Sequence, residues 1–131
     1  MERFLGRFTP HLFAILRFLA GVMFLLHGTQ KLFSWPAPGP PSLTPLQLAG
    51  GWIELVCGAL IAVGFLGSWA AFLASGEMAV AYFMFHAPKG FYPTMNDGEV
   101  AVLYCFLFLY IAAHGSGIWS VDSALWRGRR A

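Results

Sequence analysis

The chain has 131 residues, of which 58% are hydrophobic and only 11% are charged, and its formal net charge is +2. A soluble domain carries about 25% charged residues, and a chain this small has a large surface to keep in contact with water. The composition therefore excludes an ordinary soluble domain and indicates an integral membrane protein in contact with lipid, while the few scattered positive charges exclude nucleic-acid binding.

The first predicted element is a membrane-spanning helix over residues 10–33. A helix needs about 20 mainly apolar residues to cross a bilayer, and this run provides them. We expect Thr9 to cap the helix and Pro10 to occupy its first turn. The stretch "SWPAPGPPS" at 34–42 then holds four prolines in nine residues and cannot continue a helix.

The second and third spans are predicted over residues 45–65 and 69–86. Thr44 and Gln47 have the spacing of a capping box at the start of the second span. Only the short stretch "GFLGS" separates the two spans, so they must form an antiparallel hairpin. The third span ends before Pro88, which breaks the helix.

The fourth span is predicted over residues 99–117, after the loop "APKGFYPTMNDG". Asn96 and Glu99 fit the cap and third positions of its first turn. The sequence shows no internal repeat and no sign of a second domain, so we predict one domain over residues 1–131. The fold class is all-α, an integral membrane four-helix bundle with polar layers in its interior.

Arginines at the two ends predict the orientation of the bundle. Positive residues favour the cytoplasmic side of a membrane. Arg3 and Arg7 precede the first span, whereas Lys31 and Lys89 are the basic residues near the opposite ends of the spans. Three arginines follow the fourth span: Arg127, Arg129 and Arg130. Both termini are therefore expected in the cytoplasm.

Polar residues recur on one face of each span, among small residues that allow helices to approach each other. At about 1.5 Å per residue, they fall into three depths. The outer set is Gln30, Lys31, His86, Asn96 and Glu99, the middle set is His27, Glu54 and Glu77, and the inner set is Arg17 and His114. Because an isolated charge in a membrane is costly, we expect His27, Gln30 and Lys31 to contact acids of other spans. Glu54 and Glu77 are the expected partners of His27 and Arg17.

The sequence offers little for a cofactor of its own. Cys57 and Cys105 stand alone, without a C-x-x-C pair or a histidine at metal-ligand spacing. We therefore predict no metal site, no thiol mechanism and two structural cysteines. No haem-attachment motif or glycine-rich nucleotide loop is present either, so no electron carrier is expected in the chain.

Four stretches resemble the DoxX family: "LRFLAGVMFLLHGTQKLF", "GGWIELVCGALIAVGF", "ASGEMAVAYFMFHAPKGFYPTMNDGEVAVLYCFLFL" and "GSGIWSVD". The resemblance covers about residues 16–122 and implies a four-helix bundle in the plasma (inner) membrane of a bacterium or archaeon. The polar positions that it carries over are Arg17, His27, Gln30, Lys31, Glu54, Glu77, His86, Asn96, Glu99 and Asp122. Two basic positions usual in the family are missing, since Gly67-Ser68-Trp69 and Ile118 stand there.

The resemblance implies an accessory subunit of quinone-linked redox chemistry, because the family is named for a subunit linked to a thiosulfate:quinone oxidoreductase. Quinone is then the expected cofactor, and a membrane redox protein or a second copy of the chain is the expected partner. One alternative is a structural or assembly factor without catalysis, and another is a small proton or ion relay through the buried acids. No catalytic residue is assigned. A ligand in the layer of His27, Glu54 and Glu77 favours the redox role, and a fully paired layer favours the structural one.

Overall fold

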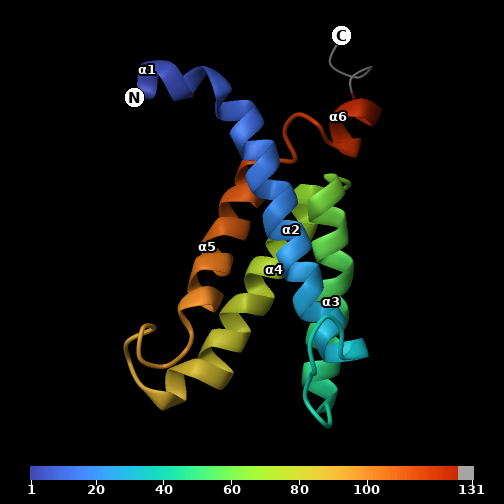
Figure 1. Cartoon of the computed structure of the whole chain (residues 1–131), viewed down its shortest axis with the longest axis vertical. Helices are drawn as coiled ribbons and strands as arrows, with labels where there is room; N and C mark the ends of the chain where they lie inside the picture. Colours follow the sequence, from blue (N-terminus) through green and yellow to red (C-terminus); the bar gives the residue numbers. More distant parts are fainter. Residues whose placement is uncertain (127–131) are drawn as a thin grey trace.

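The computed structural model describes residues 1–126, and all regular structure in that range is helical (Figure 1). The four long helices are α2 (Thr9–Phe33), α3 (Pro45–Val63), α4 (Gly67–Ala81) and α5 (Glu99–His114). The shorter elements are α1 (Glu2–Leu5), α6 (Val121–Trp126), two 3-10 turns (Gly6–Phe8 and Ala87–Lys89) and a π-helical turn (Tyr82–His86). The predicted all-α class is confirmed.

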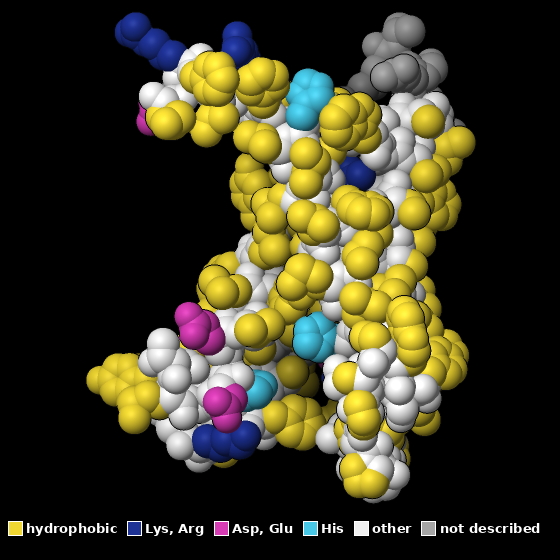
Figure 2. All heavy atoms as spheres, in the orientation of Figure 1, with side chains coloured by type: hydrophobic (Ala, Val, Ile, Leu, Met, Phe, Trp, Pro, Cys, Tyr) yellow, Lys and Arg dark blue, Asp and Glu magenta, His cyan; other side chains and the backbone are white. Residues whose placement is uncertain are grey.

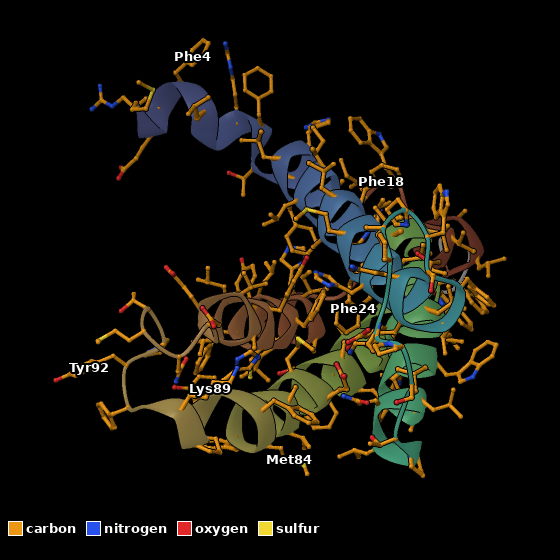
Figure 3. The ribbon with its side chains drawn as sticks, turned by 60° about the horizontal axis from the view of Figure 1, so that its bottom comes forward. Phe4, Phe18, Phe24, Met84, Lys89 and Tyr92 are labelled. Atoms are coloured by element: carbon orange, nitrogen blue, oxygen red, sulfur yellow. The ribbon has the colours of Figure 1, made fainter. Side chains whose placement is uncertain are left out.

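The long helices form two pairs that meet along α3 and α4. Helix α2 packs against α3, and α4 packs against α5. Figure 1 shows the pairs side by side near the end that holds both termini, and diverging toward the end that holds the loops at 34–44 and 90–98. Phe24 of α2 points across to α5, where it contacts Tyr104 and Phe108 (Figure 3).

Within residues 1–126, three helical segments are long and apolar enough to cross a membrane: Glu2–Phe33, Pro45–Val63 and Gly67–Lys89. Helix α5 has 16 residues and is shorter. The predicted end of the fourth span at residue 117 is wrong, because the chain leaves the helix at Gly115, whose φ is +88°. Apolar side chains cover most of the face shown in Figure 2, as expected for a surface that meets lipid.

The predicted capping box of α3 is confirmed. The amide of Gln47 donates to Thr44 Oγ1 at 3.2 Å, and the amide of Thr44 donates to Gln47 Oε1 at 3.1 Å. The predicted cap at Thr9 is wrong. Thr9 is already helical, and its hydroxyl donates back to the Gly6 carbonyl at 2.7 Å, because the chain is coiled from Glu2 onward.

Glycines bring the backbones of α2 and α3 into direct contact. A Cβ atom on Gly58 would lie 2.5 Å from the Leu25 nitrogen and 2.8 Å from the Gly21 oxygen. One on Gly28 would lie 2.6 Å from the Leu55 nitrogen and 2.7 Å from the Gly51 oxygen. The small-residue face predicted for the second span is thus a helix contact, and its partner glycines lie on the first span.

Arg17 ties α2 to the end of α3 and to the segment after α5. The side chain is 2% exposed. Its guanidinium donates to the carbonyls of four residues: Ile61 at 3.1 Å, Ser116, Ile118 at 3.1 Å and Trp119 at 2.9 Å. The predicted pairing of Arg17 with Glu54 or Glu77 is therefore wrong, because all three of its nitrogens donate to backbone carbonyls at the termini end of the bundle.

Asp122 continues this network toward α4. Its carboxylate accepts from the amides of Leu66 and Gly67, at 2.9 and 3.2 Å, and from the Ser116 hydroxyl at 2.7 Å. A carboxylate at the N-terminus of a helix also interacts favourably with the helix dipole. Burial alone raises the pKa of Asp122, but these hydrogen bonds outweigh it and hold the pKa below its ordinary value.

We expect an acid-dependent loss of stability that depends on Asp122. Because its folded-state pKa is lowered, its contribution is complete above the ordinary value of 3.8 and is lost as the pH falls through the lower folded-state value. Asp122→Asn should be less stable at neutral pH and lack this step. Thermal unfolding in detergent against pH measures it, with the exposed Glu2 changed to Gln as control. An unchanged acid step in Asp122→Asn would contradict the assignment.

Candidate functional site

A cavity of about 890 Å³ lies between the four long helices, where the two helix pairs diverge. The space-filling view shows the hollow between the two pairs (Figure 2). Its wall is mostly apolar, with side chains such as Phe24, Ile53 and Phe85. The polar residues of the wall are His27, Lys31, Gln47, Glu54, Glu77, His86, Asp97 and Tyr104.

An ion pair joins α2 and α3 at this wall. Lys31 Nζ lies 2.7 Å from Glu54 Oε1, and the Glu54 side chain is 2% exposed. The sequence placed Lys31 in the outer layer and Glu54 in the middle one. The flexible lysine side chain spans that difference in depth and brings its ammonium to the buried acid. The predicted contact between the first span and an acid of another span is thus confirmed for Lys31.

Glu77 faces the same place from α4. It lines the same cavity as Glu54 and Lys31. Two glycines, one on α3 and one on α4, leave space around the Glu77 side chain. A Cβ atom on Gly50 would come within 3.0 Å of Glu77 Oε1, and one on Gly76 would meet nothing within 4 Å. Gly50 lies one turn before Glu54 on α3, so the two acids predicted for the middle layer line the same part of the cavity wall.

Three polar atoms at this wall are buried and have no hydrogen-bond partner in the described part of the chain: Glu54 Oε2, Glu77 Oε2 and the Tyr104 hydroxyl. Tyr104 was not predicted as a site residue. Its place in α5 beside Phe108 and Phe24 is that of a packed aromatic, with ring centroids 5.3 and 5.7 Å away. The spacing of three or four residues from Ala101 to Tyr104, Phe108 and Ile111 marks the inward face of α5 and would have identified Tyr104.

His27 lies at the edge of this cluster. Its ring meets Tyr104 edge-on at a centroid distance of 6.1 Å, and the side chain is exposed and lines the cavity. Within residues 1–126, no hydrogen bond or ion pair joins His27 to Glu54 or Glu77. The predicted pairing of His27 with these acids is therefore wrong, although all three line one cavity.

The sequence predicted Asn96 as the cap of α5, and this prediction is wrong. Asn96 instead holds together the loop that precedes the helix. It is fully buried, and its amide nitrogen donates to the Gly90 carbonyl at 2.9 Å and the Tyr82 hydroxyl at 3.2 Å. Its side-chain oxygen accepts from the Gly98 amide at 2.9 Å. The Asn96 carbonyl lies 3.1 Å from His86 Nδ1, and so this loop holds His86 at the cavity.

Two other predicted site residues lie away from the acids. Gln30 donates to the Pro38 carbonyl at 3.2 Å and so fastens the proline-rich loop to α2. Glu99 is exposed at the first turn of α5, and the helix is preceded by Gly98 as its cap residue. Its predicted place in the polar interior is wrong. Asp97, which was not predicted, lines the cavity at this level instead.

Cys57 and Cys105 are both free, and Cys57 is buried in α3. Among the described residues, no three His, Cys, Asp or Glu side chains lie together in a way that could hold a metal ion. The polar side chains at the cavity wall that can donate or accept hydrogen bonds include those of Lys31, Glu54, Glu77 and Tyr104.

These features define a helical membrane protein with a polar cluster on the wall of an apolar cavity. The DoxX family model matches residues 12–87, more than half of the chain. The chain belongs to the DoxX family, as its motifs suggested. It is also 40% identical over 134 residues to a protein of Haemophilus influenzae described as uncharacterized, a match that covers 94% of this chain and 97% of the relative. No solved structure matches the chain.

Proposed function

We propose that this DoxX protein is an accessory subunit of quinone-linked redox chemistry and that it binds a quinone in the cavity between the four long helices. The observation that carries the proposal is the set of unpartnered buried polar atoms on an otherwise apolar wall, at Glu54, Glu77 and Tyr104. A buried polar atom normally has a partner, so such a set is where a ligand's polar group would complete the hydrogen bonding.

A quinone matches the shape and chemistry of this cavity. Small-molecule sites are typically concave and apolar, with a few polar groups that fix the orientation of the ligand. The Tyr104 hydroxyl can donate to a quinone carbonyl, and the apolar side chains of α3 and α4 can contact the ring and the tail. The bound quinone would accept electrons and protons there. A partner redox protein must supply the electrons, because the sequence carries no motif for an electron carrier.

The alternative of a purely structural or assembly role predicts a wall whose polar groups satisfy each other. The ion pair of Lys31 and Glu54 fits that alternative. The unpartnered atoms and the open space beside Gly76 favour a ligand instead. The two roles are separated by whether the purified protein binds a quinone.

Binding of a benzoquinone with a decyl tail, measured by calorimetry on protein in lipid nanodiscs, tests the proposal. Gly76→Leu should place a side chain in the cavity and weaken binding at least about tenfold, or about 1.4 kcal/mol. Gly6→Leu is the matched control, since Gly6 also has nothing within 4 Å and does not line the cavity. Failure of the unaltered protein to bind, or equal binding by both variants, would refute a quinone site in this cavity.

We also propose that both termini lie in the cytoplasm, with the protein in the plasma membrane. Arg3 and Arg7 support a cytoplasmic N-terminus. The other arginines used in the prediction follow residue 126 and lie outside the described residues. A reporter fused after Ala131 should be active in the cytoplasm, and one inserted at Pro38 should be active outside. The reverse pattern would refute this orientation.

A further inference from the structure

The polar cluster at the cavity wall contains more acid than base. Two carboxyl groups with buried oxygens, Glu54 and Glu77, line the same cavity as one ammonium group, Lys31, which is paired with Glu54. The other titratable groups that line the cavity are His27, His86, Asp97 and Tyr104, and Cys57 lies close enough to interact with Glu77. With one cation for two buried carboxyl groups, this part of the wall carries a net negative charge unless one carboxyl group holds a proton.

The geometry indicates which acid carries the proton. Glu54 has the Lys31 ammonium 2.7 Å from its Oε1, so Glu54 is the carboxylate partner of the ion pair. No ion pair of this kind reaches Glu77 within the described residues. A proton on Glu77 leaves one positive and one negative charge in the cluster, which is then neutral as a whole. Charge balance is strongly favoured inside a membrane.

We infer that Glu54 and Glu77 hold a single exchangeable proton, carried on Glu77, and that the protonated Glu77 donates a hydrogen bond to the carbonyl of the ligand in the cavity. The ligand part of this inference rests on the proposed function, whereas the proton site does not. Glu77 Oε2 is buried and lacks a hydrogen-bond partner among the described residues, so a proton there can be donated to Glu54 or to a ligand carbonyl. Glu77 thereby becomes the group through which quinone binding depends on pH.

Infrared difference spectroscopy on the protein without ligand tests the proton site. Spectra taken between low and high pH should contain the carbonyl stretch of a protonated carboxyl group, and that band should shift in heavy water. Glu77→Gln should remove the band. Glu99→Gln, which changes an exposed glutamate outside the cavity, should keep it. A band that persists in Glu77→Gln, or its absence from the unaltered protein, would overturn the proton site.

Quinone titrations across the same pH range test the ligand part. Because binding favours protonated Glu77, affinity should fall by up to about tenfold per pH unit on the alkaline side. Glu77→Gln keeps a side-chain donor that cannot titrate, so it should bind quinone without this pH dependence, while Glu99→Gln should retain it. A pH slope that survives in Glu77→Gln, or binding by the unaltered protein without a slope, would overturn the linkage.

The two tests fail separately. If the infrared band behaves as expected but no quinone binds at any pH, the proposed function and the ligand linkage fail while the proton site stands. If quinone binds without a pH slope, the proposed function stands and the linkage fails. Should Glu77→Gln fail to fold, Glu77→Asp provides the second variant. It keeps the acid on a shorter side chain and should move the band, and an unmoved band would assign the proton to another residue.

Discussion

Replacing Arg17 by methionine is expected to destabilise the folded protein by about 3–5 kcal/mol, the cost of breaking a buried charged network on one side. Methionine fills much of the same space but donates nothing. The carbonyls of Ile61, Ser116, Ile118 and Trp119 would lose their bonds, and buried carbonyls without a partner are costly. α6 and the segment before it should detach from the bundle first.

Thermal unfolding in detergent measures this loss, and limited proteolysis after residue 114 locates it. Arg3→Met is the matched control, because Arg3 is exposed near the N-terminus. Arg17→Lys adds a second comparison, since a single ammonium cannot reproduce the forked geometry of the guanidinium. Equal unfolding temperatures for Arg17→Met and Arg3→Met would show that the network contributes little.

Replacing Gly58 by leucine is expected to separate α2 from α3 and to prevent accumulation of folded protein. Even a Cβ atom there lies within 2.5 Å of backbone, which cannot move as a flexible side chain can. We therefore expect Gly58→Ala to cost about 1–3 kcal/mol, as for other overpacked sites, and Gly58→Leu to cost more.

Gly76→Ala is the matched control for the glycine contact. Gly76 is also a helical glycine, but a Cβ atom there meets nothing within 4 Å, so this change should be neutral or stabilise α4 by up to about 1 kcal/mol. The comparison uses unfolding midpoints in detergent. A Gly58→Ala variant as stable as Gly76→Ala would mean that α2 and α3 can separate slightly without loss.

Helix positions were readable from the sequence because apolar length, proline and the capping box act locally. The start of α3 at Pro45 is an example. The inward orientation of Glu54 on α3 and of Glu77 on α4 could also be predicted, since helical periodicity and small neighbouring residues indicate the inward side of each helix. The depth of each side-chain group in the membrane was harder to predict, because the long Lys31 side chain reaches an acid that the sequence assigned to another layer.

The partners of Arg17 could not be predicted, because they are backbone carbonyls of an irregular segment. That segment turns through positive φ angles at Gly115, Gly117 and Trp119, and no periodic pattern encodes its path. Asn96 was misassigned for a related reason. It is a residue type that often caps helices, but it belongs to a compact loop, in which it bonds to Gly90 and Tyr82 instead.

The apolar residues at the exposed rim of the cavity determine how the binding of a membrane-dissolved ligand would depend on the amount of lipid. Leu46, Phe72, Leu73 and Val80 line the cavity and are also about half exposed or more on helices that cross the bilayer. A ligand that enters past them comes from the lipid phase. Its effective concentration is then its mole fraction in the membrane, so adding lipid at constant ligand and protein dilutes it and lowers the occupancy of the cavity.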